Sequence, residues 1–157
     1  MTQSRMSQSP TPESLTPQEF AGYAALVAGS TLLQRAIERD LQQQAGITQV
    51  QFEILMTLHD VAEGLRMAEL ADRLIVSRSG LTYQVTQLEK AGRLTRKRHD
   101  ADERGIVARI TPAGETLRAR VLPGHLALVR GALFSRLTAE QLEALTSGLS
   151  DVAEGLR

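Results

Sequence analysis

The chain has no cysteine and no tryptophan, and only 3% of its residues are aromatic. Without cysteine there can be no disulfide, no catalytic thiolate, no thiol-based peroxide sensor and no cysteine ligand for zinc. Three Phe and two Tyr leave a core of aliphatic side chains and no aromatic platform on which several unpaired bases could stack. A protein that binds single-stranded nucleic acid is therefore disfavoured.

Long apolar runs are absent as well. The longest, Ala24 to Ala28, is far shorter than the roughly 20 residues that cross a bilayer. The first residues also lack the apolar segment of a signal peptide. We therefore expect a protein that is neither embedded in a membrane nor exported, and that acts in the cytoplasm.

The length of 157 residues, with 42% hydrophobic and 23% charged residues, suits one globular domain. Ten of the first fourteen residues are Ser, Thr, Gln or Pro, and they show no apolar period. Such a segment cannot bury enough apolar surface to offset its ordering entropy. We predict a disordered tail over residues 1–15 and a single folded domain over residues 16–157.

Helix start signals recur through the folded part. Thr16-Pro17-Gln18-Glu19 combines an N-cap, a first-turn proline and a capping box, and similar signals follow at Thr48, Thr111 and Thr138. Apolar residues then repeat every three or four positions, as on one face of a helix. The predicted helices run from 17 to about 45, from 49 to 64, from 67 to 74, from 78 to about 90, from 112 to about 133, and from 139 towards the C-terminus.

Two short strands, Leu94 to His99 and Ile106 to Ile110, are the only strand candidates, and a polar loop over residues 100–105 joins them. The predicted fold class is therefore mainly α (α+β), with one β-hairpin.

A net charge of zero hides a segregation of charge along the chain. Residues 66–120 hold 12 Lys+Arg and 7 Asp+Glu, and the remaining residues hold 6 and 11. A surface that binds a polyanion would therefore be formed by the middle of the chain.

The middle of the chain contains a helix, a short turn and a second helix, followed by the basic hairpin. Ser77 caps the second helix and, with Arg78, lies where the helix amides can meet a phosphate. Small and hydrogen-bonding side chains lie on the outward face of this helix, as base and phosphate contacts in a major groove require. These are Ser79, Thr82, Tyr83 and Gln87.

The hairpin supplies a second candidate contact with duplex DNA. Arg104 lies at the tip of two basic strands, where its guanidinium suits the negative potential of a minor groove. Asp102, two residues earlier, can hold this guanidinium in place through charge-assisted hydrogen bonds. Arg96 and Arg98 belong to the basic stretch from Lys90 to Arg98, in which five of nine residues are cationic.

Several stretches of this region resemble the MarR-type winged-helix regulators. They are Leu70-Ala71-Asp72-Arg73-Leu74, Leu81-Thr82, Leu88-Glu89-Lys90-Ala91-Gly92, Arg96, Asp102-Glu103-Arg104 and Ile110-Thr111-Pro112-Ala113-Gly114. The resemblance implies a winged helix-turn-helix with a two-stranded wing. Ser79, Thr82, Tyr83 and Gln87 then fall on the recognition helix, and Arg104 falls on the wing tip. Two residues depart from the family pattern: Arg93 replaces an apolar residue, and Glu103 adds a charge to the wing.

The resemblance also implies a homodimer with interlocking terminal helices, formed by residues 16–46 and 112–157, around lobes formed by residues 48–111. The long amphipathic helices themselves require a partner, and a second copy is the economical one. We expect a sequence-specific regulator of transcription that binds a pseudo-palindromic promoter site in double-stranded DNA. The resemblance further implies a repressor that responds to a small aromatic or phenolic effector. The predicted DNA-binding residues are Ser77, Arg78, Ser79, Thr82, Tyr83, Gln87, Arg96, Arg98, Asp102 and Arg104.

Two other classes of function stay open. A winged-helix module that binds proteins would share the same core, although the basic wing favours nucleic acid. An enzyme is the weakest alternative, because no phosphate loop, nucleophile elbow or metal-ligand cluster is present. His59, His99 and His125 lie far apart in the sequence and outside any two-histidine ligand motif, so we expect no metal and no cofactor.

Overall fold

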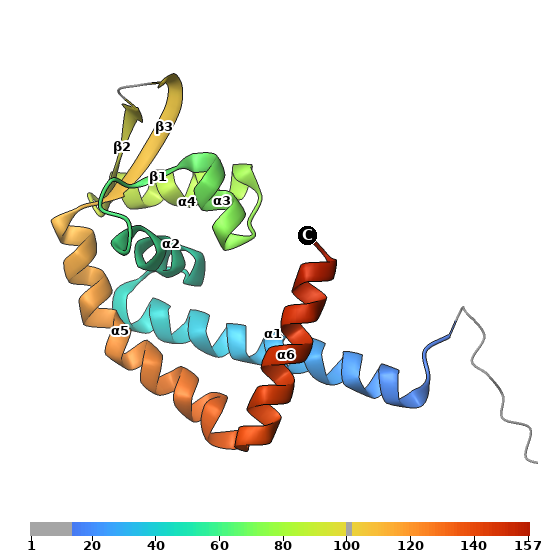
Figure 1. Ribbon diagram of the computed structural model, residues 1–157. Helices are drawn as coiled ribbons and strands as arrows, with labels where there is room; N and C mark the ends of the chain where they lie inside the picture. Colours follow the sequence, from blue (N-terminus) through green and yellow to red (C-terminus); the bar gives the residue numbers. More distant parts are fainter. Residues whose placement is uncertain (1–13, 100–101) are drawn as a thin grey trace, which may run out of the picture.

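The computed structural model describes residues 14–99 and 102–157, without the side chains of residues 99 and 102–104. The predicted disordered tail, residues 1–15, therefore lies almost entirely outside the described residues. Figure 1 shows a lobe of short helices and strands next to long helices. The elements in chain order are α1 (Pro17–Ala45), α2 (Gln49–His59), β1 (Leu65–Arg66), α3 (Met67–Leu74), α4 (Arg78–Lys90), β2 (Leu94–His99), β3 (Asp102–Ile110), α5 (Pro112–Ala132), the 3-10 turn η1 (Phe134–Arg136) and α6 (Ala139–Gly155).

Local signals set most helix boundaries, as predicted. Thr16 Oγ1 accepts the N–H of Glu19 at 3.2 Å, while the Glu19 carboxylate accepts the N–H of Thr16 at 2.7 Å. Reciprocal capping boxes of the same kind begin α2 at Thr48 and α6 at Thr138. Gly46, with φ of 62°, ends α1 in the left-handed conformation that glycine adopts without a Cβ clash.

The predicted end of the second helix at Gly64 is wrong, because α2 stops at His59. Gly64 has φ of 77°, and a Cβ at this position would collide with the carbonyl oxygen of Ala108 in β3. The glycine therefore allows the backbone to approach the sheet closely. The chain leaves α2 early and enters β1 directly after this contact.

The described part of the chain forms a sheet of three antiparallel strands in the order β1-β3-β2, so the prediction of only two strands is incomplete. Leu65 and Arg66 pair with Ala108 and Val107, and two residues are too few to show an alternating pattern in the sequence. β3 also begins at Asp102, earlier than the predicted Ile106, and the predicted loop residues 102–105 belong to this strand. β2 and β3 pair from Leu94↔Ile110 to Arg98↔Ile106, and the hairpin that they form is the wing.

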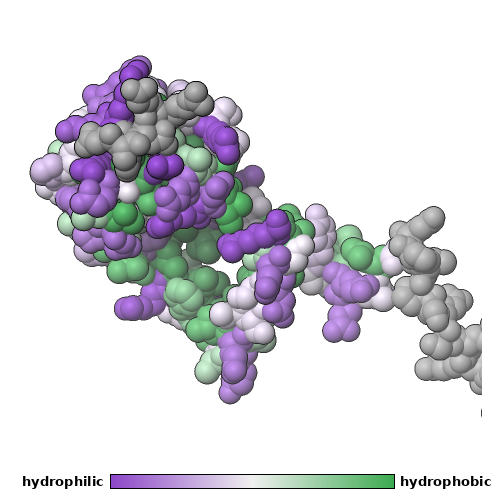
Figure 2. All heavy atoms as spheres, turned by 45° about the horizontal axis from the view of Figure 1, so that its top comes forward, coloured by the Kyte–Doolittle hydropathy of each residue, from purple (hydrophilic) through white to green (hydrophobic). Residues whose placement is uncertain are grey.

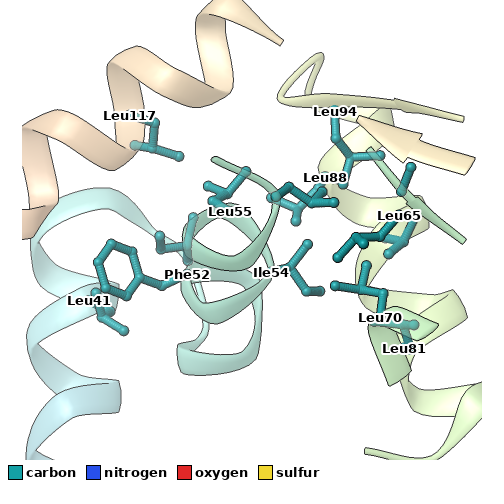
Figure 3. Packing of buried hydrophobic residues seen from close by; sticks show 14 of the residues in the cluster. Leu41, Phe52, Ile54, Leu55, Leu65, Leu70, Leu81, Leu88, Leu94 and Leu117 are labelled. Atoms are coloured by element: carbon teal, nitrogen blue, oxygen red, sulfur yellow. The ribbon is translucent and has the colours of Figure 1, made fainter. Parts of the chain in front are cut away.

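A single core, aliphatic except for Phe52, holds the lobe together, and this is close to what the composition predicts. Figure 3 shows side chains from α2, α3, α4 and the sheet that point toward one another, with Leu41 of α1 and Leu117 of α5 at one side. Ile54, Leu55, Leu70 and Leu88 are fully buried. Burial of each such side chain is worth about 1.5 to 3 kcal/mol, so this core fixes how α3 and α4 lie against the sheet.

The long helices bury much less. α1 has two buried residues, Ile37 and Leu41, over its 29 residues, and α6 has none. α5 runs through Pro123 as one helix and lies along α1 (Figure 1). Apolar side chains on the free faces remain exposed, among them Phe20, Tyr23, Leu32, Leu142, Leu149 and Val152.

Candidate nucleic-acid interface

The helix that carries most of the predicted site, α4, begins and packs as expected. Ser77 is the N-cap, and its Oγ accepts the N–H of Gly80 at 3.1 Å. Leu81, Val85 and Leu88 are buried in the lobe core. Because these residues fix one face of α4 inward, the rotation of the helix determines which side chains reach solvent.

The opposite face of α4 is polar and open. Ser79, Thr82 and Tyr83 are exposed, and Gln87 is half-buried further along the helix. Tyr83 and Gln87 make no side-chain hydrogen bond to any residue in the described part of the chain. Their donors and acceptors are therefore available to an outside partner. The hydroxyl of Thr82 instead donates to the carbonyl of Arg78 at 2.8 Å, which leaves its oxygen free to accept a hydrogen bond.

Cationic side chains lie at two places near this face. Arg78 starts α4 and Arg98 lies on β2, and both are exposed. Neither forms an ion pair with a carboxylate within the described residues. Seen from the wing end, the surface of the lobe is mostly hydrophilic, and hydrophobic residues appear more where the long helices extend away from it (Figure 2).

Arg96 is different, because it is already paired. Its Nη2 and Nε lie 2.6 Å and 3.0 Å from Oε2 of Glu89, on the last turn of α4. This guanidinium holds the pKa of the Glu89 carboxyl below its ordinary value. Asp102 and Arg104 lie on β3, but the predicted contact between their side chains lies outside the described residues.

A pocket of about 460 Å³ separates the first half of α4 from the wing. Its walls combine three arginines with backbone and apolar groups: Arg66, Met67, Ala68, Arg78, Leu81, Thr82, Arg96, Gly105 and Ile106. Arg66 is a candidate that the sequence analysis missed. The short strand β1 brings it beside β3, and only knowledge of that pairing would have placed it next to Arg78.

The described residues contain no group of three or more His, Asp or Glu side chains that could hold a metal ion. His59 is occupied by Glu115, with Nδ1 at 2.9 Å from both carboxylate oxygens, and this contact lowers the pKa of Glu115. Arg118 also donates to Glu115 at 3.1 Å, so α2 and α5 are joined by a small charged cluster. No helix in the described part of the chain is long and apolar enough to span a membrane.

Helix α3, a tight turn and α4, with the hairpin beside them, form a winged helix-turn-helix, the architecture of a large class of DNA-binding proteins. The family model for the MarR family matches residues 47–106, which cover α2 to the first half of β3.

Similar proteins support the same assignment. The MarR family transcriptional regulator Sco3205 from Streptomyces coelicolor, crystallised in complex with DNA, is 37% identical, with a TM-score of 0.90 over 95% of this chain and 94% of that one. The MarR family regulator AbsC from the same organism is 34% identical, with a TM-score of 0.86 over 92% of this chain and 98% of that one. The HTH-type transcriptional repressor YetL of Bacillus subtilis (strain 168) is 30% identical over 71% of this chain, and the match spans 66% of YetL.

The chain belongs to the MarR family, and it is a transcriptional regulator with a winged helix-turn-helix DNA-binding lobe. The predicted family and fold class are thereby confirmed. The structure brings Ser77, Arg78, Ser79, Thr82, Tyr83 and Gln87 onto one helix and places Arg96 and Arg98 on the adjacent strand. The contact of each of these residues with DNA stays a prediction.

Proposed function

We propose that the protein is a homodimeric repressor that binds a pseudo-palindromic promoter site in double-stranded DNA. The observation that carries the proposal is the open polar face of α4, where Tyr83 and Gln87 have no side-chain hydrogen bond to the described residues, beside a pocket walled by three arginines. A helix of this kind fits a major groove, whereas the exposed Arg78 and Arg98 meet the phosphates on either side. In this proposal residues 48–111 form the DNA-binding lobe, and Arg104 of the wing enters the minor groove.

The second copy of the chain covers the apolar faces of the long helices, within residues 16–46 and 112–157. A pocket of about 600 Å³ opens between α1, the end of α5 and α6, and its lining is mostly Ala and Leu. Exposed apolar surface on this scale marks an interface. A helix of the partner subunit fills the pocket. The resulting dimer holds its two DNA-binding lobes about 34 Å apart, which is one helical turn of the duplex.

Effector control acts where the dimer helices meet the lobe. A groove of about 620 Å³ lies between α1 and α2, and its walls include Arg35, Val50 and Leu74 together with the carboxylates of Glu38 and Glu53. Arg35 suits the carboxylate or phenolate of a small aromatic ligand, and Val50 and Leu74 suit its ring. Such a ligand lowers DNA affinity if it binds better to a lobe spacing that does not fit the duplex. The protein works in the cytoplasm, without catalysis.

The test is a fluorescence anisotropy titration of duplex DNA from the region upstream of the protein's own gene. It is run at several salt concentrations, with and without aromatic acids, and the oligomeric state is measured by light scattering. We expect a dimer, salt-sensitive binding, and release of DNA by at least one acid, with release reduced by Arg35→Ala. Arg104→Ala should weaken binding without loss of the dimer. A monomer that binds no duplex at low salt overturns the proposal and favours a protein-binding module instead.

A further inference from the structure

The contact between Glu89 and Arg96 joins the recognition helix to the wing. Besides the two bonds from the guanidinium to Oε2, the other carboxylate oxygen, Oε1, accepts the backbone N–H of Arg96 at 3.2 Å. One carboxylate therefore takes three donors from a single residue of β2. Both side chains are partly buried, with exposed fractions of 26% for Arg96 and 35% for Glu89.

The backbone part of this contact lies at the edge of the sheet. Within the described residues β2 has a neighbouring strand on one side only, because the strand order is β1-β3-β2. An edge strand presents N–H groups that no other strand pairs with. Glu89 takes one of these from the side of α4, so the carboxylate docks the free edge of the wing onto the helix.

The rest of the boundary between α4 and the wing is open. The pocket of about 460 Å³ separates Arg78, Leu81 and Thr82, in the first half of α4, from Gly105 and Ile106 of β3. At the base of the wing, Leu94 is buried and Thr111 Oγ1 donates to the carbonyl of Gly92 at 2.7 Å. The wing is thus fixed at its base, by the pairing of β1 with Val107 and Ala108 of β3 on one side, and by Glu89 at Arg96 of β2 on the other, and it projects freely beyond that level (Figure 1).

We propose that Glu89 and Arg96 are positioning residues that set the angle of the wing to the recognition helix before DNA arrives. Arg96 then contributes to DNA binding only by its contact with Glu89, and its guanidinium does not contact a phosphate. The proposal rests on the DNA-binding function proposed above. It accounts for a carboxylate in a basic lobe that faces a polyanion, because fixing the wing in advance removes an ordering cost from binding.

The Glu89→Gln variant separates this role from simple electrostatics, since the two explanations predict changes of opposite sign in the affinity for duplex DNA. Loss of a negative charge close to DNA raises affinity if the carboxylate has no structural task. A positioning role instead predicts duplex binding weaker by about fivefold or more, a typical size for coupling between two parts of a protein. The slope of log affinity against log salt concentration should not change, because no phosphate contact is lost.

Glu69→Gln is the matched control. Glu69 pairs with Arg73 at 2.8 Å within α3, both side chains are 48% exposed, and the substitution removes the same charge from the same lobe. Its duplex affinity should equal or slightly exceed that of the wild type, since this pair joins no two elements.

Two further variants test Arg96. Arg96→Gln should weaken binding to a similar extent as Glu89→Gln, with the salt slope kept. If Arg96 bound a phosphate, the slope would fall by about one. The charge-swapped Glu89→Arg/Arg96→Glu protein should recover part of the affinity lost by the single variants. A reduced slope in Arg96→Gln, or no recovery in the swap, contradicts the positioning role.

Amide hydrogen exchange of the DNA-free proteins gives a second readout that needs no duplex. Exchange in β2 and β3 should be faster in Glu89→Gln than in the wild type and unchanged in Glu69→Gln. If the wild-type protein binds DNA but Glu89→Gln binds equally well or more tightly, or exchanges at the wild-type rate, the positioning role is overturned and the proposed function stands. If the wild type binds no duplex, the proposed function itself fails.

Discussion

The lobe and the long helices differ in how they bury their apolar side chains. In the lobe, Leu55 and Leu88 are completely buried against their own chain. In α6, which carries an equally regular apolar stripe, Leu149 is 39% exposed and Val152 is 52% exposed. The sequence pattern of the two regions is alike, because apolar residues recur every three or four positions in both.

What differs is the identity of the partner. The lobe folds three short helices and a sheet around one core, to which Leu41 of α1 and Leu117 of α5 also belong, so the apolar faces of the lobe are covered by the same chain. Most of the apolar stripes of α1 and α6 are not covered by other parts of the same chain and stay exposed. Helical periodicity therefore shows that a face will be buried but leaves open which chain buries it, and four predictions test this division.

The largest effect is expected in the lobe. Leu55→Ala leaves a cavity in the core and should lower the free energy of unfolding by about 2 to 5 kcal/mol in urea titrations. The matched Leu149→Ala variant should cost less than about 1 kcal/mol at protein concentrations low enough to dissociate the dimer, because its side chain is already partly solvated in the single chain. Equal losses at high dilution would show that α6 belongs to the core of its own chain.

Leu149→Asp should act on assembly without unfolding the lobe. A charge on the apolar stripe of α6 must be desolvated at an interface, and the loss of the second lobe removes the gain from two linked contacts. We expect a monomer by light scattering and duplex affinity reduced by at least about 100-fold. The control is Ser147→Asp, on the opposite side of α6, which should remain a dimer. A dimeric Leu149→Asp protein would refute this interface.

Local signals explain how much of the fold could be predicted. The capping boxes at Thr16, Thr48 and Thr138 depend on residues three apart, so the sequence shows them directly. The strand Leu65–Arg66 depends on pairing with residues more than forty positions away. The same is true of the close approach of Gly64 to Ala108, which comes after the early end of α2.

The candidate site divides in the same way. The polar face of α4 could be predicted, because Leu81, Val85 and Leu88 define its buried side by period alone. The pairing of Arg96 could not, since an arginine in a basic stretch gives no sign that Glu89 of another element holds it. Composition identifies a cationic surface, whereas only the folded structure separates the arginines that are free from those already in use.

Intermediate effects are expected on the open face of α4. Tyr83→Ala and Gln87→Ala should each cost about 1 to 3 kcal/mol in binding to the cognate duplex. Each should also reduce the ratio of the affinity for the cognate duplex to the affinity for a scrambled duplex. Fold stability should hardly change, because neither side chain hydrogen bonds within the described residues. Anisotropy titrations with both duplexes measure the ratio. An equal loss on both duplexes would mean that these side chains touch only the DNA backbone.

The smallest effect is expected at His125, where α5 meets α1 and the lobe. The ring of His125 lies 4.9 Å from that of Phe52, and its Nδ1 is buried with no partner in the described part of the chain. Burial lowers the pKa of His125, while the charges of Asp40 on α1 and Glu53 on α2 act in the opposite direction. The unfolded chain therefore binds the proton more readily than the folded one.

Stability from the neutral ring should be complete above the ordinary histidine pKa of about 6.5 and should decline as the pH falls through that value. His125→Phe keeps the contact with Phe52 but has no proton to bind. Between pH 7.5 and 5.5 the variant should lose less stability than the wild type, and we expect the two losses in the free energy of unfolding to differ by no more than about 1 kcal/mol. Thermal unfolding followed by circular dichroism measures both losses. Parallel pH profiles for the two proteins would show that the boundary between lobe and long helices is open to water at this point, and that the two regions are less tightly joined than their contacts indicate.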